Sequence, residues 1–423
     1  MSAFICVYYR TIYRRFGRRG YALELKGKTY LSDQSYLEWP FFDDRHRKYA
    51  KELSEWIKKE IASLQHEEPK DNAELDELCR NFVKKLGEGG WLRYCVPEPY
   101  GGKLKSFDVR TLALTRETLS YYSGLADFSF AMQGLGSGAI TLFGSHEQKQ
   151  SYLVPVAEGK KIAAFAISEP EGGSDVAAMG TTAKLDGNEY CLNGKKAWIS
   201  NAGIADFYVL FARTDDAPGA KGLSAFIVDS DTPGITVSER INVIAPHPLG
   251  TLSLENCRIP TANMLGNSGD GFKVAMATLD VFRTTVGAAS LGFARRAMDE
   301  AIARSKQREA FGKPISEFQL IQEKIADMAL KIDAMALLIY RSAWTKDEKG
   351  TRVTRESSMA KLYGTEAAQE VIDQAVQIFG GMGVVSGVTV ERLYREIRAL
   401  RIYEGTSEIQ KLVIAGQTLS QEP

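Results

Sequence analysis

The sequence has no excess of charge of either sign. Across 423 residues, Lys and Arg together number 53, and Asp and Glu together also number 53. This balance argues against a nucleic-acid channel or a polyanionic partner. No apolar run approaches the ~20 residues that a membrane-spanning helix needs, so no transmembrane segment is expected. The chain is too long for a single core, and we expect two or three domains.

Cysteine and histidine are scarce and scattered. The cysteines are odd in number and form no Cys-x-x-Cys pair, which predicts free thiols in a reducing compartment and no structural disulfide. They are Cys6, Cys79, Cys95, Cys191 and Cys257. The four histidines are too dispersed for a cluster of metal ligands, so we expect no catalytic metal.

Acidic residues are missing from the start of the chain, where none precedes Glu24. Five arginines lie there among aromatic and aliphatic side chains. We interpret residues 1–36 as a basic N-terminal extension, and a disordered segment is one form that it could take. Such a segment is compatible with an organellar transit peptide or a membrane-surface helix, but Ser and Ala are few for a transit peptide. We therefore expect a cytoplasmic protein, with the mitochondrial matrix as the alternative.

The period of the apolar residues changes twice along the chain. Residues 37–160 show helical spacing, residues 161–272 show short β-type runs broken by turn residues, and residues 273–423 are helical again. The closely spaced turns, such as Asp186–Gly187 and Asn193–Gly194, predict hairpins in a compact barrel or sandwich. Long amphipathic runs near the end, among them one from Val388 to Tyr403, predict an antiparallel helix bundle.

Glu404 stands at a break between two of these predicted helices. It follows Arg401-Ile402-Tyr403 and precedes Gly405. A carboxylate at such a break can act as a general base where a cofactor and a substrate meet it. Taken alone, the same residues fit a surface turn between two helices.

Two segments of the predicted β domain carry polar groups at strand ends. Phe165 to Asp175 is a strand that enters a Gly-rich, acidic turn, whose N–H groups and hydroxyls could bind a ring edge or a phosphate. Trp198 to Gly203 places an indole and a hydroxyl at another strand end, which suits a flat heteroaromatic ring. Each segment alone is also typical of an ordinary β-turn.

Two further segments lie at helix ends. In Arg308 to Ile315, an arginine at a helix–helix corner can neutralise a pyrophosphate, with Phe311 beside a ring. Gln377 to Gly383 ends another helix with paired glycines that allow a phosphate or ribose to approach the backbone. Ordinary glycine C-caps are the alternative. By contrast, Gly134 to Gly138 lacks the strand and the ribose-binding acid of a dinucleotide fingerprint, and we interpret it as helix packing.

Together these five separated segments resemble the acyl-CoA dehydrogenase family, in order and spacing, from about Glu38 to Gly416. The resemblance implies an α+β multidomain fold with an N-terminal helical domain, a central β-barrel-like domain and a C-terminal four-helix bundle. It also implies non-covalent FAD, an acyl-CoA substrate, an electron-transferring flavoprotein as acceptor, and a homotetramer or dimer.

Matched position by position, the resemblance assigns residues to FAD. Some would surround the flavin, and others would bind the pyrophosphate and adenosine from a neighbouring subunit. The predicted cofactor-binding residues are Phe165, Ile167, Ser168, Ser174, Trp198, Ser200, Arg308, Phe311, Gln319, Gln377, Gly380, Gly381, Thr406 and Glu408. The predicted substrate-binding residues are Ser174, Asp280, Arg283, Tyr403 and Gly405.

Glu404 then corresponds to the base that removes the α-proton of an acyl thioester, as hydride passes from the β-carbon to flavin N5 and a trans-2-enoyl-CoA forms. Some relatives carry the base on the helix near Asp280, but Phe282 occupies the neighbouring position here. A closed, dry site should raise the pKa of the Glu404 carboxyl towards neutrality.

The sequence departs from the family pattern in the loop Ile244 to Gly250. A Gly-x-Arg-x-Ser pattern is usual there, and its arginine and serine are missing, which leaves the CoA contacts of this loop open. His247 in that loop is interpreted as a structural histidine rather than a substrate contact. The helix segment Asp127 to Met132 matches the stretch that closes the acyl tunnel. Its two phenylalanines suggest a short or medium cavity, and Asp127 suggests that a polar group could be admitted.

Two other functions stay open at this point. One is a flavin oxidase or monooxygenase on the same fold, against which the acidic residue at position 404 argues. The other is a catalytically silent relative used in assembly or binding, against which the combination of a base and FAD motifs argues.

Overall fold

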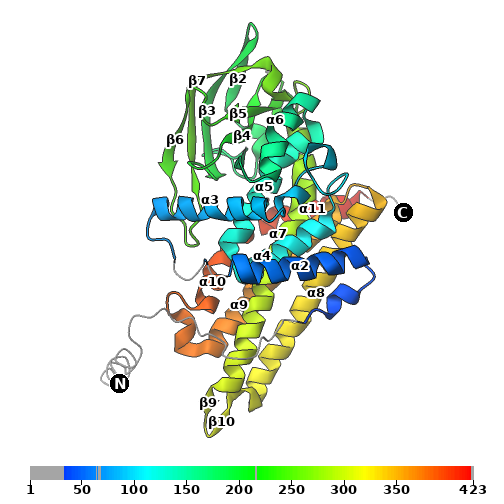
Figure 1. Ribbon diagram of the computed structural model, residues 1–423, viewed down its shortest axis with the longest axis vertical. Helices are drawn as coiled ribbons and strands as arrows, with labels where there is room; N and C mark the ends of the chain where they lie inside the picture. The colour runs from blue at the N-terminus through cyan, green and yellow to red at the C-terminus, as the bar shows by residue number, and fades with distance from the viewer. Residues whose placement is uncertain (1–32, 63, 65–67, 215–216, 421–423) are drawn as a thin grey trace.

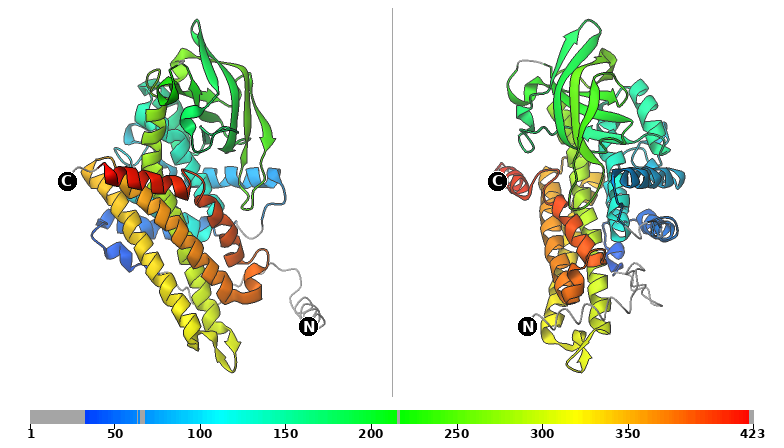
Figure 2. Two further views of the ribbon diagram at one scale, coloured as in Figure 1. Left: turned by 180° about the vertical axis from the view of Figure 1, so that it is seen from behind. Right: turned by 90° about the vertical axis from the view of Figure 1, so that its left-hand side faces the viewer.

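A computed structural model describes residues 33–420 apart from 63, 65–67 and 215–216. A β-sheet lies at one end of an elongated molecule, and long helices extend away from it (Figure 1). Figure 2 shows that the early helices α2 and α3 cross the outside of these long helices. The expected basic extension falls largely outside the described residues. At its boundary, Tyr36 is buried and stacks on Tyr340 with ring centroids 5.6 Å apart.

The first domain is helical, as expected, and side-chain caps mark its helix starts. Asp71 accepts hydrogen bonds from two backbone N–H groups at the start of α3, and Ser145 caps α6. We had not predicted α6, which is only weakly amphipathic and contains Pro155. The helices are α2 (Asp44–Glu60), α3 (Asn72–Glu88), α4 (Val109–Tyr122), α5 (Gly124–Phe143) and α6 (His146–Ala157), with 3-10 turns at Ser35–Glu38, Leu92–Tyr94 and Glu98–Tyr100.

The middle domain is one eight-stranded sheet in the order β6-β7-β3-β2-β4-β5-β8, with β1 paired in parallel to β4. The strands are β1 (Ala163–Ala166), β2 (Thr182–Asp186), β3 (Glu189–Ser200), β4 (Phe207–Arg213), β5 (Leu223–Asp229), β6 (Ile235–Arg240), β7 (Leu249–Pro260) and β8 (Met264–Leu265). Alternate residues of β4 face two different cores: Phe207 and Val209 face the helices, and Tyr208 faces a core enclosed by the strands. The sheet therefore curls around apolar contents of its own.

One expectation about the strands was wrong, and one strand was missed. Asn193–Gly194 is not a hairpin turn, because it lies inside β3 at a register shift against β7. The long strand β7 was not predicted from the sequence. Along β7, apolar residues such as the buried Leu252 and Leu254 alternate with β-branched and polar residues. This period-2 pattern was present in the sequence.

The third domain is a helix bundle. Its elements are α7 (Gly271–Gln307), β9 (Glu309–Ala310), β10 (Lys313–Pro314), α8 (Gln319–Lys349), α9 (Thr354–Phe379), α10 (Thr389–Leu400) and α11 (Ser407–Leu419). The helix α10 ends at Leu400, three residues before the expected Tyr403. Residues 401–406 therefore form a longer connection than the sequence suggested. None of the described helices is long and apolar enough to cross a membrane.

The helix α7 passes against α4 at close range and joins the first domain to the third. Gly292 has no room for a side chain, because an added Cβ would clash with the Glu117 carbonyl oxygen and the Ser120 hydroxyl. Buried polar contacts fix the same interface: Arg295 Nε donates to Glu117 Oε1 at 2.7 Å, and Ser120 Oγ donates to the Ala289 carbonyl at 2.8 Å. The relative placement of α4 and α7 is thus closely specified.

This packing predicts the effect of adding one methyl group. Gly292→Ala should lower the free energy of unfolding by about 1–3 kcal/mol, because the backbone of α4 must move to admit the Cβ. Gly416→Ala on α11 is the matched control, since nothing lies within 4 Å of its added Cβ. Thermal unfolding of both variants checks the expectation, and an unchanged midpoint for Gly292→Ala would contradict the close approach.

Candidate active site

Glu404 occupies a strained turn between α10 and α11. Its φ is +54°, in the left-handed region that residues other than glycine seldom adopt, and Gly405 follows at φ +91°. Such strain costs about 1–3 kcal/mol and persists only where surrounding contacts enforce it. Two other predicted site residues, Trp198 and Phe311, also have positive φ. Three of the five described non-glycine residues with this geometry are therefore predicted site residues.

The helices on either side hold the turn. Lys361 on α9 is fully buried and donates from Nζ to the Gly405 carbonyl at 2.7 Å. Gln410 on α11 donates from Nε2 to the carbonyls of Glu404 and Gly405 at 3.0 and 3.1 Å. The side chain of Thr406 caps α11 by accepting from the Ile409 N–H. The backbone of the turn therefore has fixed partners, which leaves the Glu404 carboxyl free to serve another purpose.

A second anchor lies behind the turn. Glu366 on α9 pairs with Arg401 Nη2 at 2.6 Å and accepts a hydrogen bond from the Ser407 hydroxyl. The Ser407 N–H in turn donates to the Arg401 carbonyl at 3.2 Å. These contacts join the end of α10 to the start of α11. Neither Lys361 nor Glu366 was singled out from the sequence, since a charged residue within a helix usually indicates an exposed face.

Glu404 is half-buried as a residue, but its Oε2 is buried and has no hydrogen-bond partner among the described residues. Burial is the largest influence on the carboxyl and raises its pKa above the ordinary glutamate value. The cations Arg116, Arg283 and Lys361 oppose that shift without cancelling it. An acid group in this setting is poised to accept a proton.

The predicted pair Asp280 and Arg283 lies on α7 and is buried. Arg283 Nη1 donates to Asp280 Oδ1 at 3.2 Å, while Arg352 and Thr354 bind the other carboxylate oxygen at 3.1 and 3.0 Å. Arg283 Nε is buried with no hydrogen-bond partner in the described part of the chain. Because Arg283 acts on the Glu404 carboxyl, these α7 residues share the neighbourhood of the turn.

The two strand-end segments singled out in the β domain meet. The Ala197 N–H donates to the Ser168 carbonyl at 3.0 Å, so the turn after β1 runs beside the end of β3. This contact brings Ser168 close to Trp198, a residue that is 58% exposed at a strand end. Phe165 is buried on β1, whereas Ile167, Ser168 and Ser200 are half-buried and Ser174 is exposed.

A buried ion pair holds this junction. Lys196 Nζ donates to Glu169 Oε1 at 2.7 Å, and Glu169 accepts from the N–H groups of Gly180 and Thr181. Burial lowers the pKa of Lys196 to about 8. The Glu169 carboxylate therefore bridges the turn after β1 and the start of β2. We missed this pair in the sequence because its members are 27 residues apart.

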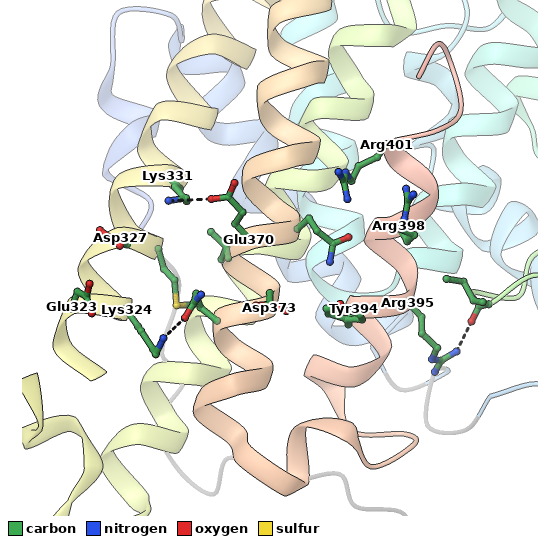
Figure 3. Close-up of a pocket in the computed structure, with 15 residues that line it drawn as sticks. Glu323, Lys324, Asp327, Lys331, Glu370, Asp373, Tyr394, Arg395, Arg398 and Arg401 are labelled. Carbon is green, nitrogen blue, oxygen red and sulfur yellow. Dashed lines mark hydrogen bonds and ion pairs between the residues drawn. The ribbon is translucent and has the colours of Figure 1, made fainter. Parts of the chain in front are cut away.

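A hollow in the described part of the chain lies elsewhere. It has a volume of about 710 Å³ and lies between α8, α9 and α10 (Figure 3). Charged side chains line it, including Lys331, which pairs with Glu370 at 3.3 Å, and Arg395, which donates to the Ile244 carbonyl at 2.8 Å. Of the residues that line this hollow, Arg401 lies nearest to Glu404 in the sequence. The hollow contains none of the predicted site residues.

Comparison with known proteins now decides the family. Models of the acyl-CoA dehydrogenase N-terminal, middle and C-terminal domains match residues 43–160, 164–257 and 269–419. The chain belongs to the acyl-CoA dehydrogenase family. The three-domain fold and the oxidoreductase class expected from the sequence are thereby confirmed.

Three relatives illustrate the likeness. The human mitochondrial short-chain specific acyl-CoA dehydrogenase is 45% identical over 342 residues, which cover 80% of this chain and 82% of that protein. The caffeyl-CoA reductase-Etf complex subunit CarC of Acetobacterium woodii is 36% identical over 389 residues, 90% of this chain and all of that protein. The structure of a Bacillus anthracis acyl-CoA dehydrogenase complexed with FAD has a TM-score of 0.82 and 34% identity, and covers 92% of this chain and 71% of that chain.

Within this acyl-CoA dehydrogenase, one set of predicted cofactor residues lies far from Glu404. The strands β9 and β10, which carry Phe311 between them, are at the opposite end of the bundle from α5 and α11 (Figure 1). Phe311 is 97% exposed, and nothing would contact a Cβ added at Gly380 or Gly381. The whole set is exposed: Arg308, Phe311, Gln319, Gln377, Gly380 and Gly381. One chain therefore does not bring this set to Glu404.

Other predicted residues flank Glu404 in the sequence. Tyr403 is partly exposed, but its hydroxyl is buried and interacts with Arg116. Glu408 is exposed in the first turn of α11.

His247 packs on Phe128 with ring centroids 4.7 Å apart, and burial lowers the pKa of His247. The glycines Gly134 and Gly138 pack against Phe282, which agrees with their interpretation as helix-packing residues.

The buried lysine predicts a measurable pH effect. Lys361→Met removes both the donor to Gly405 and a cation that favours the Glu404 carboxylate, so the pKa of Glu404 should rise. Because a base acts only when deprotonated, the acidic limb of the rate of flavin reduction should move to higher pH by about 1 unit. Lys411→Met, at an exposed position on α11, should leave the profile unchanged. A wild-type profile for Lys361→Met would show that Lys361 does not tune the base.

Proposed function

We propose that the protein oxidises an acyl-CoA thioester to the trans-2-enoyl-CoA, with Glu404 as the base that removes the α-proton. The observation that carries this proposal is the buried Oε2 of Glu404, which has no hydrogen-bond partner within the described residues and sits in an enforced turn. A buried, unpaired carboxylate oxygen is costly unless a bound molecule uses it.

The cofactor is FAD, and residues at two strand ends of the β domain suit it. The exposed indole of Trp198 offers a flat surface, while the hydroxyls of Ser168 and Ser200 and the N–H groups of the turn after β1 offer polar contacts. When bound, FAD supplies the acceptor for the hydride that leaves the β-carbon. The exposed set around Phe311 supports a second contact with FAD, made from a neighbouring copy in a homotetramer or dimer.

The residues around Glu404 each have a part in the proton transfer. Burial keeps the carboxyl basic, and Lys361 and Gln410 hold the backbone so that the side chain keeps its direction. The Glu404 N–H could donate to the thioester oxygen, on which negative charge develops as the α-proton leaves. Arg283 and Asp280 would contact the CoA portion, with Ser174, Tyr403 and Gly405 nearby.

Electrons then pass to an electron-transferring flavoprotein, as the Etf complex of the Acetobacterium woodii relative suggests. The acyl group is proposed to be short, in keeping with the human short-chain specific relative. The cytoplasm is the proposed compartment, and the mitochondrial matrix is the alternative if the basic N-terminal segment directs import.

Removing the base tests the proposal. Glu404→Gln keeps the shape of the side chain but cannot accept a proton, so anaerobic bleaching of the flavin by butyryl-CoA should slow at least ~10³-fold while FAD stays bound. Glu255→Gln, at an exposed position on β7, is the control and should bleach at the wild-type rate. Wild-type bleaching by Glu404→Gln, or a purified protein that binds no FAD, would refute the assignment.

A further inference from the structure

The end of β3 has a strained backbone. Trp198 and Asn201 have φ +60° and +64°, and they are two of the five described non-glycine residues with φ in the left-handed region. The register of β3 against β7 shifts between Lys196 and Ile199, which marks a bulge at this point. Backbone strain of this kind persists only where surrounding contacts enforce it. The segment that presents Trp198 must therefore be held by its neighbours.

Lys196 holds this segment on one side. Its ammonium group is fully buried and has three protons to donate, and three acceptors lie within reach. They are Glu169 Oε1 at 2.7 Å, the Ile167 carbonyl at 3.3 Å and Met179 Sδ at 3.7 Å. Because Ile167 and Glu169 belong to the turn after β1, this one side chain ties the bulge of β3 to that turn.

Asn201 holds the segment on the other side. It is buried, and its Nδ2 donates to the Ala163 carbonyl on β1 at 2.9 Å. Between the two side chains lies the backbone contact from the Ala197 N–H to the Ser168 carbonyl at 3.0 Å. The end of β3 is therefore fastened at three points to β1 and the turn that follows it.

This fastening matters for a rigid, flat cofactor ring. The surface that suits FAD is divided between two segments, with the indole of Trp198 on one and the hydroxyl of Ser168 on the other. A rigid ring contacts both at once only when the two segments keep a fixed separation, and a preformed surface avoids the cost of ordering them. A buried ion pair adds little net stability over apolar side chains of the same volume, but every proton in it needs an acceptor. Such a pair is therefore better suited to fixing a geometry than to strengthening a core.

We propose that Lys196 and Glu169 are positioning residues for FAD, whose ion pair holds the turn after β1 and the end of β3 in the arrangement that receives the flavin ring. This inference rests on the proposed function in its cofactor alone, because it concerns the binding of FAD and not the removal of a proton. It is independent of the acyl group and of the role of Glu404.

The test removes both charges and keeps the volume. Lys196→Met with Glu169→Gln leaves no buried charge without a partner, and the side-chain amide can still accept from the Gly180 and Thr181 N–H groups, so the protein should fold. The thioether cannot donate to the Ile167 carbonyl, so the tie to the turn is lost. Release of FAD from diluted holoenzyme, followed by the rise of flavin fluorescence, should be at least ~10-fold faster than in the wild type.

A second readout reports on the ring itself. The visible circular dichroism of bound flavin depends on the groups packed around the ring, so it should change in the double variant as Trp198 and Ser168 move. Trp198→Leu tests whether the pair acts through the indole. In that background the double substitution should accelerate FAD release by less than about 3-fold, because the two sites are coupled. An equal acceleration with and without the indole would overturn the proposal.

Another lysine–glutamate pair supplies the matched control. Lys85 on α3 donates to Glu60 on α2 at 3.1 Å, and both residues are half-buried in the first domain. Lys85→Met with Glu60→Gln makes the same chemical change outside the β domain. It should leave the rate of FAD release and the flavin dichroism at their wild-type values.

The outcomes separate this inference from the proposed function. If the double variant of Lys196 and Glu169 folds, releases FAD at the wild-type rate and keeps the wild-type dichroism, the inference is refuted while the function stands. If the purified wild type binds no FAD, the proposed function itself fails. Should the double variant not fold, Glu169→Asp decides: it keeps both charges but shortens the reach of the carboxylate, so FAD release should still accelerate, and a wild-type rate would refute the inference.

Discussion

The arrangement of this protein depends on one buried carboxyl group held in a left-handed turn. A glutamate at φ +54° is unfavourable on its own, and a buried carboxylate oxygen without a partner is unfavourable again. Both are sustained because α9 and α11 bind the backbone on either side through Lys361 and Gln410. The bundle thus stabilises a conformation that the local sequence would not adopt by itself.

Charge balance around that carboxyl explains why several ions can be buried together. Arg116 pairs with Asp127, and Arg283 pairs with Asp280, a carboxylate that also pairs with the exposed Arg352. Lys361 is the exception, since it binds a backbone carbonyl, and burial lowers its pKa to about 8. The Glu404 carboxyl is consequently moderated by cations without being locked into an ion pair, which keeps its unpartnered oxygen available.

Much of this could be predicted from the sequence, for identifiable reasons. The succession of helices, strands and helices follows from apolar periodicity. Glu404 was singled out because Gly405 marks a helix break, and only the family resemblance assigned it the role of base. The strand β7 was missed although its alternation was visible, and Asn193–Gly194 was taken for a turn because a bulge inside a strand uses the same residues. Contacts that depend on tertiary packing were beyond local patterns: nothing near Arg116 indicates Thr285, and nothing near Lys361 indicates Gly405. Phe311 is exposed and remote from Glu404, a separation that the local sequence around either residue does not indicate.

The most direct measurement of the central claim is the exchange of the α-hydrogens of enzyme-bound butyryl-CoA with D₂O, followed by mass spectrometry as a function of pH. If Glu404 is the buried base, deuterium should enter the α-position at a rate that rises through an apparent pKa above the ordinary glutamate value, because burial raises the pKa of this carboxyl. Absence of exchange in FAD-loaded enzyme, or exchange that persists when residue 404 is glutamine, would contradict the account.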